Sequence, residues 1–120
     1  MTFPQISYKY NSLEEGPELA TQIEQKLTGL EKFLPESGAM TCEVEFEKVA
    51  PQQQGPIHRV EVNLEIDGTL FRAEATEETF TEAIDEVRDE LAKELRRSKS
   101  KQSTQAIDAA RAAKEQLREG

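Results

Sequence analysis

The sequence is poor in the residue types that most often build reactive or metal-binding sites. It has no tryptophan, one cysteine and one histidine among 120 residues. One cysteine cannot form an internal disulfide, and neither Cys42 nor His58 belongs to a pair spaced for zinc. No glycine-rich stretch has the pattern of a phosphate-binding loop. We therefore predict that the protein is not an enzyme and uses no metal, no cofactor and no small-molecule substrate.

Long apolar runs are missing as well. None approaches the roughly 20 residues that a membrane-spanning helix needs. The N-terminus, MTFPQISYKY, lacks the basic start and apolar middle of a secretory signal. We expect a soluble, cytoplasmic protein that makes no membrane contact. Its length suits one domain with a modest core.

Positive charge is scarce overall but concentrated in one region. The net charge is −9. Residues 1–87 hold 6 Lys/Arg against 18 Asp/Glu, whereas residues 88–101 hold 6 against 3. Local potential decides what a surface attracts, so the acidic total does not exclude a polyanionic partner. The simpler alternative is a basic helix end that complements the helix macrodipole.

Four segments alternate between apolar and polar residues, which is typical of half-buried strands. They cover residues 4–10, 40–48, 57–67 and 69–76. Cys42 lies on an apolar side, where we expect a small core residue. Asp67-Gly68 predicts a two-residue hairpin, because both positions tolerate positive φ. A carboxylate cluster of Glu43, Glu45 and Glu65 lacks the closed oxygen cage of a divalent-cation site, so solvation is the expected reason for it.

Two segments have apolar residues at helical spacing. The first covers residues 17–34, begins near Pro17, contains Gly29 and stops before Pro35. The second lies within residues 77–101, and either Thr76 or Thr79 caps it, the latter forming a capping box with Glu82. Its apolar stripe consists of Phe80, Ala83, Ile84, Val87, Leu91 and Leu95.

This order of elements predicts an α+β fold with β-α-β-β-β-α topology. We expect a two-layer sandwich in which both helices pack on one face of a four-stranded sheet. The predicted domain spans residues 1–101. Residues 102–120 form a helix-prone or flexible C-terminal tail, which could extend the second helix, form a short separate helix or fray.

The polar faces of the two helices would then lie close together. Lys26 and Lys32 of the first helix could join Lys93, Arg96, Arg97 and Lys99 of the second in a basic groove. Such a groove suits phosphate contacts without base readout, as in recognition of a structured RNA. The alternative is a solvated surface with ion pairs along the helix, such as Glu90–Lys93 or Asp89–Lys93.

Several segments resemble a known family. QKLTGLEKF at residues 25–33 is similar to the K-L-x-K-L-E-K-aromatic segment of bacterial ribosome hibernation factors, also called ribosomal subunit interface proteins. TLFRAEA at residues 69–75 and FTEAIDEVRDELAKELRRSKSK at residues 80–101 follow in matching order. The resemblance covers about residues 3–101, and the family fold is also β-α-β-β-β-α.

The resemblance implies a ribosome-binding translation inhibitor that occupies the mRNA and tRNA channel of the small ribosomal subunit. It implies a short-type factor, monomeric off the ribosome, because residues 102–120 are too few for the ribosome-dimerising domain of long members. Lys9 and Arg88 are weaker candidates for RNA contact than the other cations. The implied contacts to ribosomal RNA phosphates come from Lys26, Lys32, Arg88, Lys93, Arg96, Arg97 and Lys99.

Two departures from the family pattern reduce the expected positive charge. Gly29 and Glu90 stand where family members often carry a cation, and the outer strand surface is unusually acidic. A second hypothesis therefore stays open: a protein–protein interaction module that keeps the fold and uses its acidic sheet face.

Overall fold

The computed structural model describes residues 3–13, 16–35, 38–49 and 55–119, with side chains described up to Lys99. Four strands form one sheet in the spatial order β1-β2-β3-β4. Their bounds are Ile6–Asn11 for β1, Met40–Lys48 for β2, His58–Ile66 for β3 and Thr69–Glu77 for β4. Each strand begins and ends within two residues of its predicted bounds.

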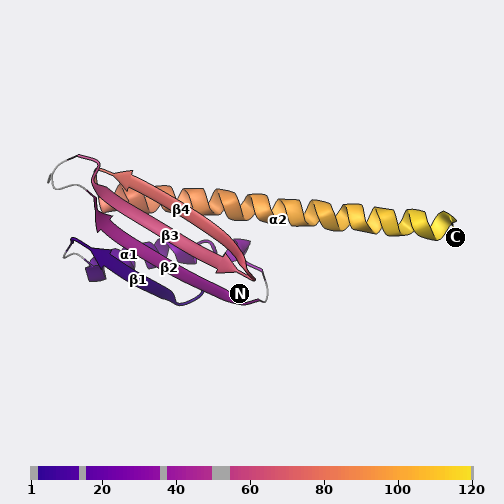
Figure 1. Cartoon of the computed structure of the whole chain (residues 1–120), viewed down its shortest axis with the longest axis horizontal. Coiled ribbons are helices and arrows are strands. Elements are labelled where there is room, and N and C mark those ends of the chain that lie inside the picture. The colour runs from indigo at the N-terminus through magenta and orange to yellow at the C-terminus, as the bar shows by residue number, and fades with distance from the viewer. Residues whose placement is uncertain (1–2, 14–15, 36–37, 50–54, 120) are drawn as a thin grey trace.

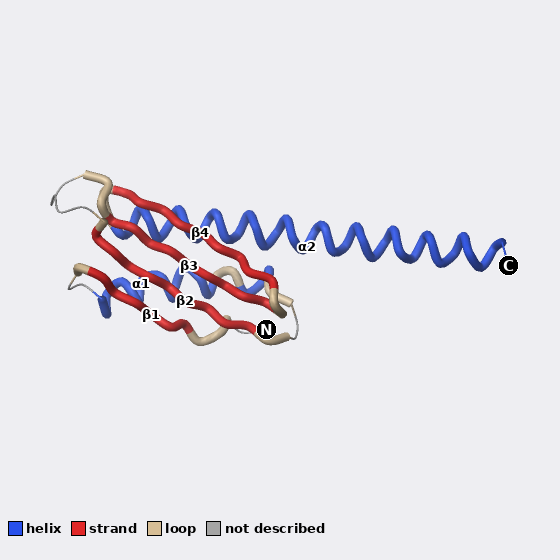
Figure 2. Tube along the Cα trace, in the orientation of Figure 1, coloured by secondary structure: helices blue, strands red, loops and turns tan. Residues whose placement is uncertain are grey.

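The sheet is mixed. β2, β3 and β4 run antiparallel, as the short predicted connections require, while β1 pairs parallel to β2 with Ile6 opposite Cys42. Parallel neighbours need a crossover connection, and helix α1 (Gly16–Thr28) supplies it. The crossover brings α1 to the same face as α2 (Phe80–Glu119), and the other face carries no helix (Figures 1 and 2). The predicted two-layer α+β architecture is confirmed.

The core lies between the two layers. Alternate residues of the strands, such as Cys42, Phe46 and Val62, are buried against apolar residues of the helices, such as Ile23 and Ile84. Cys42 is thus the core residue that the alternation predicts. Neither helix of the described chain has an apolar stretch that would cross a membrane.

The first helix ends earlier than predicted. α1 stops at Thr28, Gly29 and Leu30 form a turn, and a 3-10 turn, η1 (Glu31–Phe33), follows. Phe33 N donates to Leu30 O at 2.9 Å, an i→i+3 bond in place of the α-helical one. Glycine weakens the helix at this point, yet Leu30 and Leu34 remain buried. The apolar residues therefore keep their helical spacing across the end of α1, and the sequence pattern does not show that the helix stops there.

The hairpin between β3 and β4 is the predicted one. Asp67 and Gly68 both have positive φ, at 48° and 84°. The Asp67 carboxylate also accepts a hydrogen bond from Ala39 N at 2.9 Å, which ties the hairpin to the start of β2. Gly38 lies so close to this carboxylate that a Cβ there would collide with it.

Helix α2 begins as predicted and continues far beyond the sheet. Glu82 N donates to Thr79 Oγ1 at 3.1 Å, which caps the first turn. The helix then runs for 40 residues without interruption, so residues 102–119 extend α2 rather than form a separate element. Figure 1 shows the helix leaving the sandwich as a projecting rod, and the molecule is accordingly 70 Å long.

Candidate nucleic-acid interface

A groove lies between α1 and α2 on the side away from the sheet. It has a volume of about 480 Å³ and is lined by Gln25, Lys26, Gly29, Asp85, Arg88 and Asp89. Lys26 is in the last turn of α1, and Gly29 follows that helix directly. Two of the predicted RNA contacts, Lys26 and Arg88, therefore lie on one surface with Gly29, the position where family members often carry a cation.

Both cations of the groove are paired with carboxylates. Lys26 Nζ lies 3.1 Å from Asp85 Oδ1, which links α1 to α2, and an Arg88 guanidinium nitrogen lies 2.8 Å from Asp89 Oδ1. The charges of the groove therefore cancel in the free protein. A phosphate that binds here must compete with these two exposed ion pairs, each of which is worth little in water.

A second group of cations surrounds an aromatic ring at the end of η1. Lys32 Nζ lies 5.2 Å from the Phe33 ring centroid, and Arg96 Cζ lies 5.7 Å from the same centroid. Arg96 Nε donates to Ala92 O at 3.3 Å, which directs the guanidinium toward η1. Among the described side chains, neither cation has a carboxylate within ion-pair distance. We call Lys32, Phe33 and Arg96 the Phe33 cluster.

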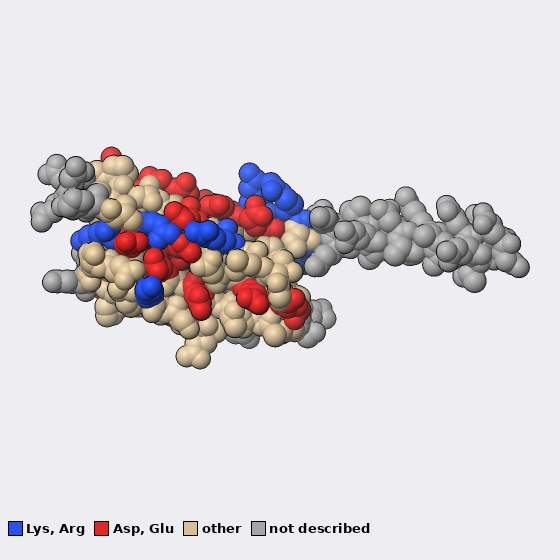
Figure 3. Space-filling model, in the orientation of Figure 1, with Lys and Arg blue, Asp and Glu red and all other residues tan. Residues whose placement is uncertain are grey.

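The remaining predicted contacts on α2 diverge from this cluster. Arg97 follows Arg96 by one residue, so it points about 100° away around the helix. Its guanidinium lies 3.5 Å from Glu94 Oε1. Lys93 precedes Arg97 by four residues and shares its stripe of the helix, as does Glu90. Figure 3 shows basic and acidic side chains mixed where the described part of the surface ends.

Lys99 lies in neither the groove nor the Phe33 cluster. It lines a cleft at the end of the domain together with Phe33, Leu95 and the β3–β4 hairpin. Of the seven predicted contacts, two lie in the groove, two in the Phe33 cluster and one in this cleft. The other two, Lys93 and Arg97, are exposed on α2 outside these three places. Lys9 lies on the opposite face of the sheet, where its Nζ is 3.7 Å from Glu45.

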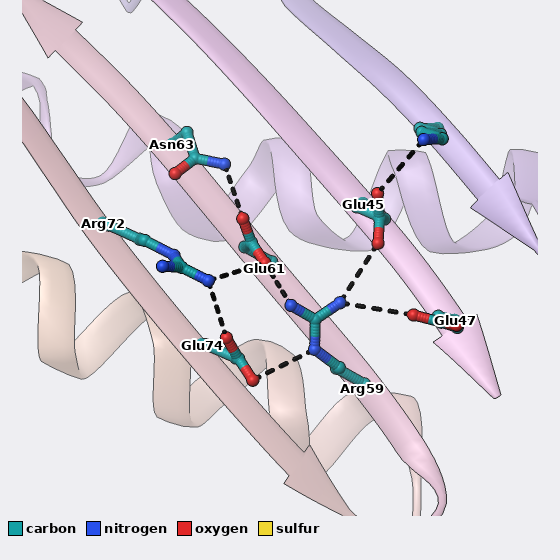
Figure 4. A network of polar contacts seen from close by, with 8 residues as sticks. Glu45, Glu47, Arg59, Glu61, Asn63, Arg72 and Glu74 are labelled. Atoms are coloured by element: carbon teal, nitrogen blue, oxygen red, sulfur yellow. Dashed lines mark hydrogen bonds and ion pairs between the residues drawn. The ribbon is translucent and has the colours of Figure 1, made fainter. Parts of the chain in front are cut away.

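The outer sheet face carries a charge network that sequence reasoning missed. Arg59 of β3 contacts four glutamates on three strands, of which Glu61 is the nearest (Figure 4). The other distances are 3.1 Å to Glu45, 3.4 Å to Glu47 and 3.0 Å to Glu74. Alternation placed each of these residues on this face, but only the strand register shows that they converge on one guanidinium.

Hydrogen bonding within this network changes the acidity of its members. The amide of Asn63 donates to Glu61 at 2.8 Å, and with Arg72 and Arg59 it lowers the pKa of Glu61 although partial burial opposes this. Arg59 likewise lowers the pKa of Glu74. In return, the hydrogen bond that Arg59 Nε donates to Glu74 is the main cause that raises the pKa of Arg59. The contacts among Arg59, Glu61 and Glu74 therefore favour the charged form of each of these three groups.

The described residues contain no group of three or more histidine, cysteine or acidic side chains placed to hold a metal. Glu43 is opposite Asn63, whereas Glu65 is opposite Thr41, so the strand register separates these two carboxylates. The His58 ring packs edge-on against Phe80 at 4.8 Å. Its Nδ1 lies 3.3 Å from Glu77 O, so His58 is part of the packing at the start of α2.

The fold recurs in two solved structures. The N-terminal domain of Thermus thermophilus Protein Y superimposes with a TM-score of 0.64 at 23% identity, covering 78% of this chain and 98% of that domain. A ribosomal subunit interface protein from Coxiella burnetii gives a TM-score of 0.60 at 18% identity, covering 79% and 97% of the two chains. At these identities the likeness shows a shared fold.

A comparison at the level of sequence families goes further. No curated protein matches the chain. The family model described as "Sigma 54 modulation protein / S30EA ribosomal protein" matches residues 6–103, which is most of the chain and nearly all of the sandwich. The chain therefore belongs to this family, the family of the hibernation promoting factors that its motifs resemble.

Proposed function

We propose that this protein binds the small ribosomal subunit and inhibits translation as a hibernation factor in the cytoplasm. In this proposal the helix layer occupies the channel that mRNA and tRNA would otherwise use. The support is the family match over residues 6–103 and the name of the Coxiella burnetii relative, a ribosomal subunit interface protein.

The observation that carries the proposal is the Phe33 cluster. Its two cations come from different helical elements, lie on one ring and have no carboxylate partner among the described side chains. Unpaired cations attract phosphate without first breaking an ion pair, so the Phe33 cluster is favoured as an anion site over the paired cations of the groove. The paired groove cations, Lys26 and Arg88, would contribute once RNA displaces Asp85 and Asp89.

The mechanism needs only occupation of the channel. Contacts to phosphates position a protein on RNA without reading its sequence. Each neutralised phosphate releases counterions, so binding should weaken steeply as salt rises. The protein would act as a monomer, because one sandwich presents both helices on a single face.

Co-sedimentation with purified small subunits at low and high salt tests the proposal. We expect binding at low salt that Arg96→Glu abolishes and Lys9→Glu leaves intact, since Lys9 lies on the opposite face. Arg97→Glu should weaken binding less than Arg96→Glu, because Arg97 is paired with Glu94 on a different stripe. Failure of the unmodified protein to sediment with small subunits at any salt would refute the proposal.

A second candidate is a protein–protein interaction module on the same fold. Its support is the outer sheet face, where the exposed Glu43 and Glu65 have no ion pair among the described side chains. Glu43→Lys combined with Glu65→Lys separates the two functions. Under the first proposal ribosome binding persists in this variant, whereas under the second the variant loses its partner.

A further inference from the structure

A cleft opens where η1, the β3–β4 hairpin and α2 meet. Its volume is about 450 Å³, within the range of small-ligand pockets. The lining is mixed: Phe33, Leu34, Ile66, Phe71 and Leu95 supply apolar surface, and polar side chains, among them Asp67 and Lys99, supply the rest. Two aromatic rings from separate elements thus line a space at the end of the domain, beside the unpaired cations.

The charge around this cleft is positive. Lys99 is in the lining, and Lys32 and Arg96 lie over the Phe33 ring that forms part of the wall. The carboxylate in the lining is Asp67, which accepts the hydrogen bond from Ala39 N at 2.9 Å and so is held against the loop before β2. Aromatic rings and cations therefore lie close together at this end of the domain.

We propose that this cleft receives one unstacked nucleobase of single-stranded RNA, an inference that rests on the proposed function and gives it a specific contact. A nucleobase offers flat faces to Phe33 and Phe71, and the phosphates on either side of it can meet Lys32, Arg96 and Lys99. Stacking on aromatic side chains is how proteins hold the splayed bases of single-stranded RNA.

Charge complementarity favours RNA over a protein segment as the occupant. An apolar side chain from a protein would fill the same space but would leave the three cations without partners. Phosphate binding alone, conversely, would use the cations and leave the apolar walls in water. A base with its flanking phosphates satisfies both parts of the site.

Fluorescence anisotropy with two oligomers of equal charge tests the proposal: a short oligouridylate and an abasic ribose-phosphate oligomer of the same length. We expect the unmodified protein to bind the oligomer with bases about 5- to 100-fold more tightly. Phe33→Leu and Phe71→Leu, which keep an apolar side chain, should each remove this preference, and Phe71→Leu, which lies outside the Phe33 cluster, should leave binding to the abasic oligomer unchanged. Lys99→Gln should weaken binding to both oligomers and reduce the salt dependence of binding by about one ion.

Leu70→Ala is the matched control, because Leu70 is an exposed apolar residue of β4 outside the cleft. It should leave the preference intact, and thermal melting checks that every variant is folded. Equal affinity for the two oligomers, no measurable binding at low salt, or a preference that survives both phenylalanine variants would overturn the inference. So would loss of small-subunit binding in Phe33→Leu with an unchanged base preference, because a ribosomal protein would then occupy the cleft.

The outcomes also separate this inference from the proposed function. If Phe71→Leu loses its base preference but still sediments with small subunits, both stand. If the unmodified protein prefers bases but never sediments with small subunits, the base site stands and the ribosomal role fails. If it sediments but shows no base preference, the ribosomal role stands and the base site fails.

Discussion

Arg59 illustrates how one residue can make an acidic surface stable. Four glutamate side chains surround it, and its own side chain is only 16% exposed. Adjacent strands would otherwise place Glu45, Glu61 and Glu74 in one row across the sheet, where like charges repel. Without Arg59 this face would oppose folding.

We therefore expect Arg59→Met to lower the free energy of unfolding by about 1–2 kcal/mol at pH 7, between the values for exposed and buried ion pairs. The pKa values of Glu61 and Glu74 are lowered from the ordinary 4.5 in the folded state. Their contribution is thus present above that value and is lost as pH falls through the folded pKa. Urea denaturation at pH 7 and at pH 3 should show the difference between the two proteins shrinking in acid.

Arg72→Met provides the comparison for this experiment. Arg72 contacts two of the same glutamates, at 3.2 Å and 3.1 Å, but its side chain is 55% exposed. Arg72→Met should lower the free energy of unfolding less than Arg59→Met does at neutral pH. Equal stability of all three proteins at pH 7 would mean that the network contributes nothing measurable.

Cys42 is the other residue with a checkable chemical property. Burial raises the pKa of its thiol to about 12, well above the ordinary value of 9.0. Since the thiolate is the reactive form, Cys42 should react with a thiol reagent at pH 8 only when the protein unfolds. Introducing Ser7→Cys on the exposed outer face should add one thiol that reacts at once. Rapid reaction of the native protein without that substitution would contradict the buried position.

At the scale of elements, α2 combines two different parts in one helix. Up to Leu95 it is a core element whose apolar stripe packs on β3 and β4. Beyond the sheet the same helix continues to Glu119 with no strand beneath it (Figure 1). A helix outside the sandwich has little apolar surface to bury against the domain, so the fold should depend little on it.

Deletion of residues 102–120 should accordingly leave the melting temperature of the domain nearly unchanged. Circular dichroism should show a loss of helical signal from the deleted part. The matched control is a deletion that begins at Leu95, which removes a buried side chain and should destabilise the domain strongly. A large fall in melting temperature on the shorter deletion would show that the domain needs the projecting helix.

Sequence periodicity predicted the elements well because burial on one face imposes it directly. The strand bounds, the Asp67-Gly68 hairpin and the Thr79 cap all follow from local rules. The break after α1 was missed because Leu30 and Leu34 stay buried through a 3-10 turn. The convergence on Arg59 was missed because it depends on register between strands, which no single segment encodes.

The site was predictable to a similar degree. Sequence located the cations on the helices, but not their partners. Lys26 meets Asp85 only because α1 and α2 pack side by side, and Arg96 meets Phe33 only because η1 replaces the last turn of the expected helix. Neighbours in sequence, Arg96 and Arg97, proved to face different surroundings.

At the scale of the whole molecule, we expect internal ion pairs to limit the phosphate contacts that the proposed function requires. Asp85 and Asp89 hold the two groove cations in the free state. Replacing both with asparagine keeps similar shapes and releases Lys26 and Arg88. We expect tighter binding to small subunits and a steeper salt dependence, by up to about one ion per released cation.

The control is Glu82→Gln combined with Glu86→Gln, which makes the same change in total charge on α2 away from the groove. If both double variants bind equally, the general reduction of negative charge explains the gain. If only Asp85→Asn with Asp89→Asn binds more tightly, release of the groove cations is the cause. No gain in either variant would mean that the groove does not contact the ribosome.

The unbroken course of α2 joins the domain to its projecting end without a connecting loop. An α-helix rises 1.5 Å per residue, so residues 102–119 reach roughly 27 Å beyond the basic end of the domain. The orientation in which the Phe33 cluster docks therefore also sets the direction of the far end of α2. A small rotation of the docked domain becomes a displacement of many ångströms at the tip, and a fluorescent label near residue 115 would report the docking angle itself.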